Sequence, residues 1–219
     1  AIRRQRQMCI RDRSSIVRKA SKKYLGLKQY HTYDRFLELA HSNKEYTYEE
    51  AKELFFHSIS QFPQDFQDKA HEVLRDGFVD VMEKVGKRTG AYSSSVANLH
   101  PFILLNFDHT LDSVFTVAHE AGHSIHSMYA TQTQPTMLQD YTIFVAEIAS
   151  TFNEHTLLDY FLSLPDATKE EKIMVIQKAI DEIMSTFYRQ TLFAEYEYLA
   201  NHEAVSYTHL RAHETLMNL

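Results

Sequence analysis

Cysteine is nearly absent from this chain of 219 residues, which contains only Cys9. A single cysteine forms no internal disulfide and supplies no cluster of thiolate ligands, so a disulfide framework and a cysteine-ligated zinc site are both excluded. Long apolar runs are also lacking. None reaches the roughly 20 residues of a membrane-spanning helix, because Glu147 interrupts the longest candidate. The lack of disulfides is typical of a cytoplasmic protein.

An excess of positive charge is missing as well. The chain has 23 Lys and Arg against 29 Asp and Glu, a net charge of -6. An acidic balance argues against binding to the phosphates of nucleic acid or to an anionic membrane surface. We therefore expect neither nucleic acid nor a membrane among the partners.

The most informative motif is His119–His123, which reads His-Glu-Ala-Gly-His within a proline-free stretch, 110–130, of helical spacing. Residues four apart share one face of a helix, so His119 and His123 can direct two ring nitrogens at one point. Glu120 lies about 100° round the helix from His119. It would stand beside a metal rather than on it, where it can accept a proton from a water. The motif therefore predicts a centre with one zinc ion per chain and Glu120 as its general base.

The surroundings of the motif make an accidental pairing of histidines the weaker interpretation. The apolar residues before it, from Val114 to Ala118, predict a buried helix, in which two histidines and a glutamate need partners. Gly122 between the histidines costs a helix up to ~1 kcal/mol relative to alanine. We expect a local reason for it, such as the close approach of another backbone or side chain.

The third ligand separates the classes of such zinc enzymes. The metzincin class would have glycine and histidine where this chain has His126 and Tyr129. The alternative is a downstream carboxylate, and Glu147 lies in a second apolar helix, 141–164, where an unpaired carboxylate is costly. Glu147 is the best candidate, with Asp140 and Glu154 as the competing carboxylates.

Three nearby residues have open roles. Asp140 lies at the start of the second helix, where a capping role suffices. Glu154, seven residues after Glu147, either orients a ligating histidine or is an ordinary solvated residue. His126 lies about 20° from His119 on the same face. It can be a spare ligand, a donor to a ligand or a satisfied polar residue. We expect a supporting role, because a fourth ligand would close the centre to water.

Several separated motifs, in this order, resemble bacterial oligoendopeptidase F, one of the thimet-oligopeptidase-like zinc metallopeptidases. The resemblance covers roughly residues 14–200. The motifs are YLGLKQYHTYDRF (24–36), GKRTGAYSSS (86–95), HPFILLNF (100–107), TVAHEAGHSIHS (116–127) and QPTMLQDYTIFVAEIASTFNE (134–154).

The resemblance implies a mainly α fold, a helical zincin-type catalytic region with a small β-sheet beside the active-site helix. It implies that His119, His123 and Glu147 bind zinc, that Glu120 is the general base, and that Glu154 is the second glutamate of the Glu147 motif. It further implies a bacterial peptidase that cleaves short peptides. No residue is assigned to substrate binding, because the histidine and tyrosine region used by the family would lie beyond residue 204. We therefore expect the chain itself to be inactive.

The two ends do not share this resemblance. Residues 1–13 contain five arginines, and residues 205–215 read VSYTHLRAHET. We expect 1–13 and 205–219 to be translated sequencing-adapter sequence, which leaves 14–204 as a fragment of an oligopeptidase catalytic domain. Without these ends the chain has 17 basic and 27 acidic residues, a net charge of -10, and no cysteine.

The periodicity predicts a chain of helices around one short strand. The strand, 102–107, either lies in the core or pairs with a peptide substrate. A buried stripe is expected on the last helix at Ile173, Ile176, Ile180, Ile183 and Phe187, with part of it exposed if its packing partners lie outside this fragment. The expected helices are 14–25, 46–60, 66–85, 110–130, 141–164 and 167–200.

A different class of function stays open at this point. A di-iron or di-manganese helical-bundle oxidoreductase uses paired Glu-x-x-His motifs. The chain has two, Glu38–His41 and Glu120–His123. This interpretation leaves His119 without a role, so the zinc peptidase is favoured. The third possibility is a catalytically inactive fragment.

Overall fold

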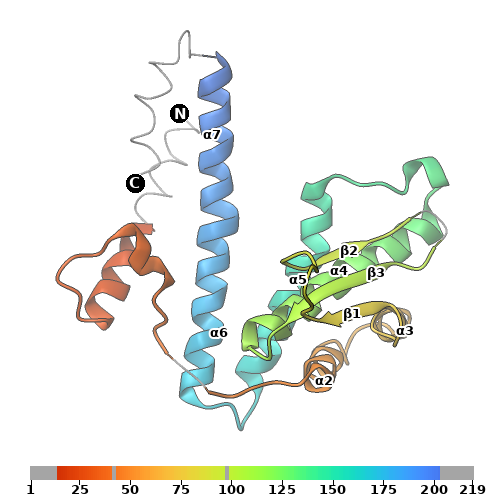
Figure 1. Cartoon of the computed structure of the whole chain (residues 1–219), viewed down its shortest axis with the longest axis horizontal. Coiled ribbons are helices and arrows are strands. Elements are labelled where there is room, and N and C mark those ends of the chain that lie inside the picture. Colours follow the sequence, from red (N-terminus) through yellow and green to blue (C-terminus); the bar gives the residue numbers. More distant parts are fainter. Residues whose placement is uncertain (1–13, 41–42, 97–98, 203–219) are drawn as a thin grey trace. The chain divides into compact units, whose positions relative to one another are not determined.

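The computed structural model describes residues 14–40, 43–96 and 99–202. The chain divides into two units, one formed by residues 42–167 and the other by residues 1–41 and 168–219 (Figure 1). The segments 1–13 and 205–219, predicted to be adapter-derived, lie outside the described residues, so that prediction stays untested.

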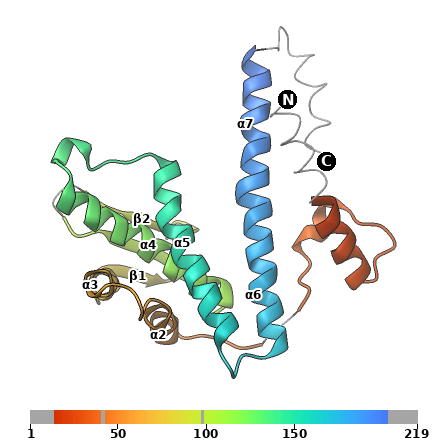
Figure 2. The same cartoon turned by 180° about the vertical axis from the view of Figure 1, so that it is seen from behind.

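The unit of residues 42–167 combines four helices with a three-stranded sheet of order β1-β3-β2 (Figures 1 and 2). Strand β1 pairs parallel to β3, and β2 pairs antiparallel to β3 with Ser93 opposite Ile103. Helix α4 packs on β2 and β3 and also contacts the other three helices. The elements are α2 (Tyr48–Ser58), α3 (Gln64–Val73), β1 (Val79–Met82), β2 (Tyr92–Ser94), β3 (Phe102–Phe107), α4 (Leu111–Thr133), η2 (Thr136–Leu138) and α5 (Ile143–Ser163).

Helix α4 is the centre of this unit, and its start is fixed by side chains. The Thr110 hydroxyl accepts a hydrogen bond from the Ser113 N–H, and Asp108 accepts from the hydroxyls of both residues. These bonds satisfy donors that the first turn of a helix leaves unpaired. Val114, Phe115, Val117 and Ala118 are buried behind this cap, which confirms the predicted buried helix.

Helices α4 and α5 approach most closely at Gly122. A Cβ atom at this position would lie 2.9 Å from the Ala149 carbonyl oxygen, 2.9 Å from the Ser150 Cα and 2.6 Å from the Asn153 amide nitrogen. Real Cβ atoms essentially never come so close to backbone, so only glycine permits this approach. The expected local reason for Gly122 is therefore confirmed.

The predicted helix over 66–85 is wrong in its second half. Helix α3 ends at Val73, and the chain turns through Gly77, which has a φ of 91°, into β1. The short run Val79–Met82 alternates in burial, as a strand does, because it pairs with β3. A partner about 25 residues away in sequence overrides the local helical spacing.

The start of α5 also differs from its prediction. The helix begins at Ile143 with Thr142 as its N-cap, and no side chain caps it. Asp140 is exposed and precedes this cap, so its suggested capping role is wrong. The helix itself matches the predicted range 141–164 within two residues at each end.

The other unit is built on one long helical segment. It comprises α6 (Lys169–Glu182), the π-helical turn η3 (Ile183–Tyr188) and α7 (Arg189–His202), and residues 14–24 and η1 (Thr32–Phe36) are also helical. The Gln177 amide joins α6 to the earlier segment by accepting from the Leu39 N–H at 2.8 Å and donating to the Leu37 carbonyl.

Most of the apolar stripe predicted on this segment is exposed, which is the alternative that the sequence left open for it. Ile176, Ile180, Ile183 and Phe187 are exposed, with 38–63% of their surface accessible, and Val175 is the fully buried apolar residue of α6. Helical periodicity indicates that residues share a face, but it does not supply the element that would cover that face.

We expect Gly122→Ala to lower the free energy of unfolding by about 1–3 kcal/mol, because the added methyl group forces α4 and α5 apart. Urea denaturation followed by circular dichroism measures this change. Asn153→Ala and the double variant separate the two possible clashes. If the backbone of α5 is the obstacle, the glycine substitution destabilises equally with and without Asn153. A loss below about 0.5 kcal/mol for Gly122→Ala would contradict the close approach.

Candidate metal centre

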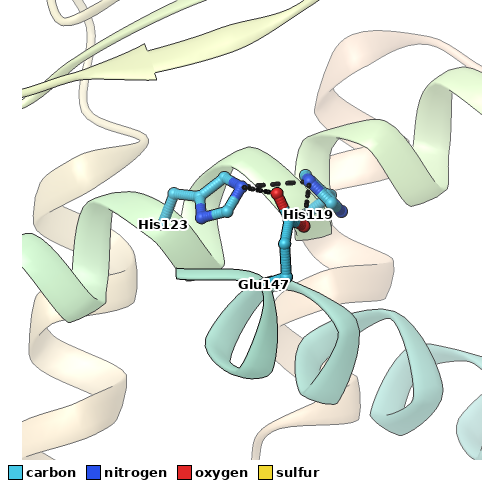
Figure 3. Close-up of side chains that lie close together, drawn as sticks. All are labelled: His119, His123 and Glu147. Carbon is cyan, nitrogen blue, oxygen red and sulfur yellow. Dashed lines mark hydrogen bonds and ion pairs between the residues drawn. The ribbon is translucent and has the colours of Figure 1, made fainter. Parts of the chain in front are cut away.

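His119 and His123 direct their rings at one point, as their spacing on α4 predicts. Their Nε2 atoms lie 3.1 Å apart, and the ring planes are nearly perpendicular at 85° (Figure 3). Both side chains are partly buried, with 24% and 17% of their surface exposed. Each imidazole therefore presents the same nitrogen to a common point between the two rings.

Glu147 reaches the same point from α5 (Figure 3). Its carboxylate oxygens lie 3.6 Å from His119 Nε2 and 3.9 Å from His123 Nε2. One donor atom from each residue falls within 4.8 Å of the others, and among the described residues this is the one such group of three. Ligands of a tetrahedral zinc with bonds of ~2.0–2.1 Å are separated by about 3.3–3.4 Å. The donor set and its spacing therefore fit a zinc ion.

The opposite side of each imidazole has a hydrogen-bond partner. His119 Nδ1 contacts Glu154 Oε1, and the backbone carbonyl of Ala146 accepts a hydrogen bond from the His123 ring. A donor on Nδ1 leaves the Nε2 lone pair available to a metal. Glu154 has only 12% of its side chain exposed, so it is not the solvated helix residue that the sequence left open.

These contacts move the pKa values of the two histidines in opposite directions. Burial lowers the pKa of His119, but the Glu154 hydrogen bond and charge outweigh burial, so the net pKa is raised. Burial and the charge of His119 lower the pKa of His123. The pair therefore favours a state in which at most one ring is protonated at neutral pH.

Glu120 lies on the side of α4 that faces the sheet. It is 5% exposed, receives a hydrogen bond from the Ser93 backbone N–H, and has one buried oxygen, Oε2, with no hydrogen-bond partner in the described structure. Burial raises its pKa to about 7. A carboxylate with such a pKa exchanges protons readily near neutral pH.

His126 is on the same face as the ligands but outside the three-residue group. Its ring stacks on Tyr141 with 4.0 Å between centroids and 20° between planes, and its Nδ1 is buried without a partner. Burial lowers its pKa. The structure therefore does not support His126 as a spare ligand, and Asp140 is likewise outside the group.

Sequence reasoning missed several residues that frame the centre. The Tyr141 hydroxyl pairs with the Ser127 hydroxyl at 2.6 Å and donates to the His123 carbonyl at 3.5 Å. Two serine pairs join β2 and the residue after it to α4: Ser93 with Ser124, and Ser95 with Ser127. The available signal was the spacing of Ser124 and Ser127 at four and seven residues after Glu120, which places all three on one helix face.

Of the two alternatives that the sequence left open for the strand 102–107, the structure supports the core strand. Strand β3 (Phe102–Phe107) is paired on both sides, by β1 and by β2, so it cannot add a substrate. Strand β2 pairs only with β3 among the described residues, so it is the edge strand to which a peptide could add. The short motif Tyr92–Ser94 showed too little alternation to be recognised as a strand from sequence.

A His-Glu-x-x-His helix that faces a glutamate on an antiparallel helix, beside a small sheet, defines the zincin-like class of peptidases. The chain belongs to peptidase family M3, whose family model matches residues 2–218. This confirms the predicted family and the mainly α fold with a small sheet.

The relatives named oligopeptidases extend this likeness. The chain is 38% identical over 184 residues to oligopeptidase PepF of Bacillus subtilis, which covers 84% of this chain and 27% of that protein. It is 36% identical over 203 residues to group B oligopeptidase PepB of Streptococcus agalactiae, which covers 92% and 33%. The chain thus spans about a quarter to a third of the length of these relatives.

Solved structures share the same arrangement. A provisionally assigned peptidase from Chlamydophila abortus has a TM-score of 0.76 and 40% identity, over 90% of this chain and 33% of its own. PZ peptidase A, solved with an inhibitor, has a TM-score of 0.64 over 84% of this chain and 33% of its own. At 16% identity it shows the fold alone.

The raised pKa of Glu120 predicts how the stability of the metal-free chain depends on pH. The folded-state pKa of about 7 is above the ordinary value of 4.5, so the folded chain binds the Glu120 proton more tightly than the unfolded chain does. The contribution of this proton to the free energy of unfolding is fully present below pH 4.5 and is lost as the pH rises through 7. Glu120→Gln, which is neutral throughout, should therefore stabilise the metal-free chain at pH 8 by up to ~3 kcal/mol, and much less at pH 5.

Urea denaturation in the presence of a chelator at the two pH values measures this difference. Asp159→Asn, an exposed residue of α5, is the control for a general effect of charge removal. A stabilisation by Glu120→Gln that is equal at both pH values would show that burial does not raise this pKa.

Proposed function

We propose that this chain carries the zinc centre of a metalloendopeptidase that hydrolyses peptide bonds in short oligopeptides. One zinc per chain would be held by His119 Nε2, His123 Nε2 and a Glu147 carboxylate oxygen. The observation that carries the proposal is the meeting of these three donors within 4.8 Å, with the Nδ1 side of His119 turned to Glu154. Membership of peptidase family M3 supports it.

The chemistry follows from the donor set. When bound, the zinc lowers the pKa of a water molecule and polarises the carbonyl of the peptide bond. Glu120 accepts the proton of the attacking water at Oε2, the buried oxygen without a partner, and passes it to the leaving amine.

Glu154 has a positioning role in this proposal. Its carboxylate fixes the ring of His119 and keeps the proton on Nδ1, which directs the Nε2 lone pair to the zinc. The Ala146 carbonyl does the same for His123 from the backbone. His126 is not one of the ligands in this proposal.

A peptide is the substrate that the surroundings favour. The free edge of β2 offers main-chain donors and acceptors beside α4, and an extended peptide can add to such an edge as a further strand. The curated relatives are named oligopeptidases, which supports short peptides. In the described residues no helix is long and apolar enough to cross a membrane. The bacterial cytoplasmic location and the absence of nucleic-acid partners stay predictions.

The di-iron alternative has less support. Its first motif includes His41, which lies outside the described residues. The group of donors in the structure contains His119, which that alternative leaves without a role. Family membership also favours the peptidase.

The metal content distinguishes these functions. Elemental analysis of the purified chain should find about one zinc per chain, and Glu147→Ala or His123→Ala should lose it. Glu120→Gln should retain the metal. In the protein that carries this segment at the length of its relatives, the same substitution should lower cleavage of a quenched peptide by at least about 10²-fold. Two irons per chain, or full activity of Glu120→Gln, would contradict the proposal.

Glu154→Gln tests the positioning of His119. We expect the dissociation constant for zinc to rise by about 10–100-fold, because the amide orients the ring less firmly and no longer attracts its Nδ1 proton. Competition with a fluorescent zinc chelator measures the constant. Asp159→Asn, five residues further along α5 and exposed, is the matched control. An unchanged constant for Glu154→Gln would mean that the contact with His119 does not tune the centre.

A further inference from the structure

Helix α4 and strand β2 run in the same direction. Ser93 of β2 pairs with Ser124 of α4 at 2.8 Å, and Ser95 pairs with Ser127 at 3.3 Å, so both elements advance together. A peptide that adds to the free edge of β2 in the antiparallel sense, the commoner and slightly more stable pairing, therefore runs opposite to α4. Its amino-terminal residues then lie toward the carboxyl end of α4.

His126 is the next residue of α4 on the ligand face in that direction. His119, His123 and His126 fall within about 60° of one another around the helix, whereas Glu120, Ser124 and Ser127 form the neighbouring face toward the sheet. From the midpoint of the two ligands to His126 is five residues, about 7.5 Å along the helix axis. An extended peptide covers this length in about two residues.

Contacts with Tyr141 fix the orientation of the His126 ring. It lies nearly flat on Tyr141, whose hydroxyl is fixed to α4 through Ser127 at 2.6 Å. The Nδ1 atom is buried without a partner, so Nε2 is the nitrogen through which the ring can meet a ligand. A buried N–H without an acceptor costs about 1–3 kcal/mol, so the proton belongs on Nε2, which makes this atom a donor.

We propose that His126, stacked on Tyr141, binds a main-chain carbonyl of the peptide about two residues on the amino-terminal side of the cleaved bond. This inference rests on the proposed zinc centre, and it adds a substrate-binding residue to it. Because a main-chain carbonyl is present in every peptide, His126 would select for substrates that extend far enough beyond the cleaved bond rather than for one side chain.

Peptide hydroxamates of increasing length test the proposal. The hydroxamate binds zinc at the carboxyl end, and successive alanines extend toward the amino-terminal side. The series is acetohydroxamate, acetyl-alanine hydroxamate and acetyl-dialanine hydroxamate, each titrated calorimetrically into the zinc-loaded chain. We expect one step of this series, at the second alanine, to tighten binding by about 5–10-fold.

His126→Ala should remove this step and leave the affinity for acetohydroxamate within about twofold. His126→Gln, which retains an N–H donor, should keep part of the step. The control is His57→Gln, because His57 also stacks on a tyrosine, Tyr160, but that pair lies on α2 and the far part of α5. A step that survives in His126→Ala, or an equal loss for every hydroxamate, would overturn the proposal.

A change in the ligand tests the same contact without any variant. Replacing the acetyl amide of the dialanine compound by an uncharged fluoroalkene isostere, which lacks the carbonyl oxygen, should cost the wild-type chain the whole step. Equal affinity for the two compounds would overturn the role of His126. Failure of acetohydroxamate itself to bind the zinc-loaded chain would instead overturn the zinc centre, and with it the site built on that centre.

Discussion

The close contact of α4 with α5 at Gly122 is the constraint on which the centre depends. The missing side chain lets the backbone at Ala149 and Ser150 approach α4 between the two histidines. Glu147 precedes this crossing point and Glu154 follows it, so both carboxylates reach His119 from the same helix. A methyl group at the crossing point would widen the gap over the whole centre, because the two helices are rigid at this scale. One glycine thus contributes to metal geometry without touching a ligand atom.

Charge balance is the second constraint, and it follows from the first. Three carboxylates, those of Glu120, Glu147 and Glu154, lie around two histidines in a partly buried space. Burial raises the pKa of Glu120, and the charges of Glu147 and Glu154 add to this effect. Such a cluster is unfavourable unless a cation or protons offset it. The raised pKa values of Glu120 and His119 favour the protonated forms of both groups in the metal-free chain. A divalent ion bound by the donors would compete with those protons, so metal affinity should rise with pH.

Much of this centre could be predicted from the sequence, because it depends on helical periodicity. Residues four apart share a face whatever the rest of the fold, and the apolar run around Glu147 signals a carboxylate that needs a partner. The sheet and the long helical segment could not be predicted in the same way. β1 exists because β3 pairs with it, and the apolar stripe from Ile176 to Phe187 is exposed because periodicity names no covering element. The role of Tyr141 could not be predicted, because its hydrogen bond to Ser127 of α4 crosses the turn that follows this helix.

The seven-residue spacing of the two glutamates of α5 does not show which of them lies beside both histidines. The direction of α5 relative to α4 does. Seven residues apart, Glu147 and Glu154 lie on nearly the same face, about 10 Å apart along the helix, so either could have been the ligand. The antiparallel course of α5 against α4 places Glu147 beside both Nε2 atoms and Glu154 beside Nδ1 of His119 alone. The two nitrogens of an imidazole point to opposite sides of the ring, and each meets a different carboxylate. A parallel α5 would have exchanged the two glutamates. Helix direction, which cannot be read from the sequence, therefore decides which glutamate lies beside both Nε2 atoms.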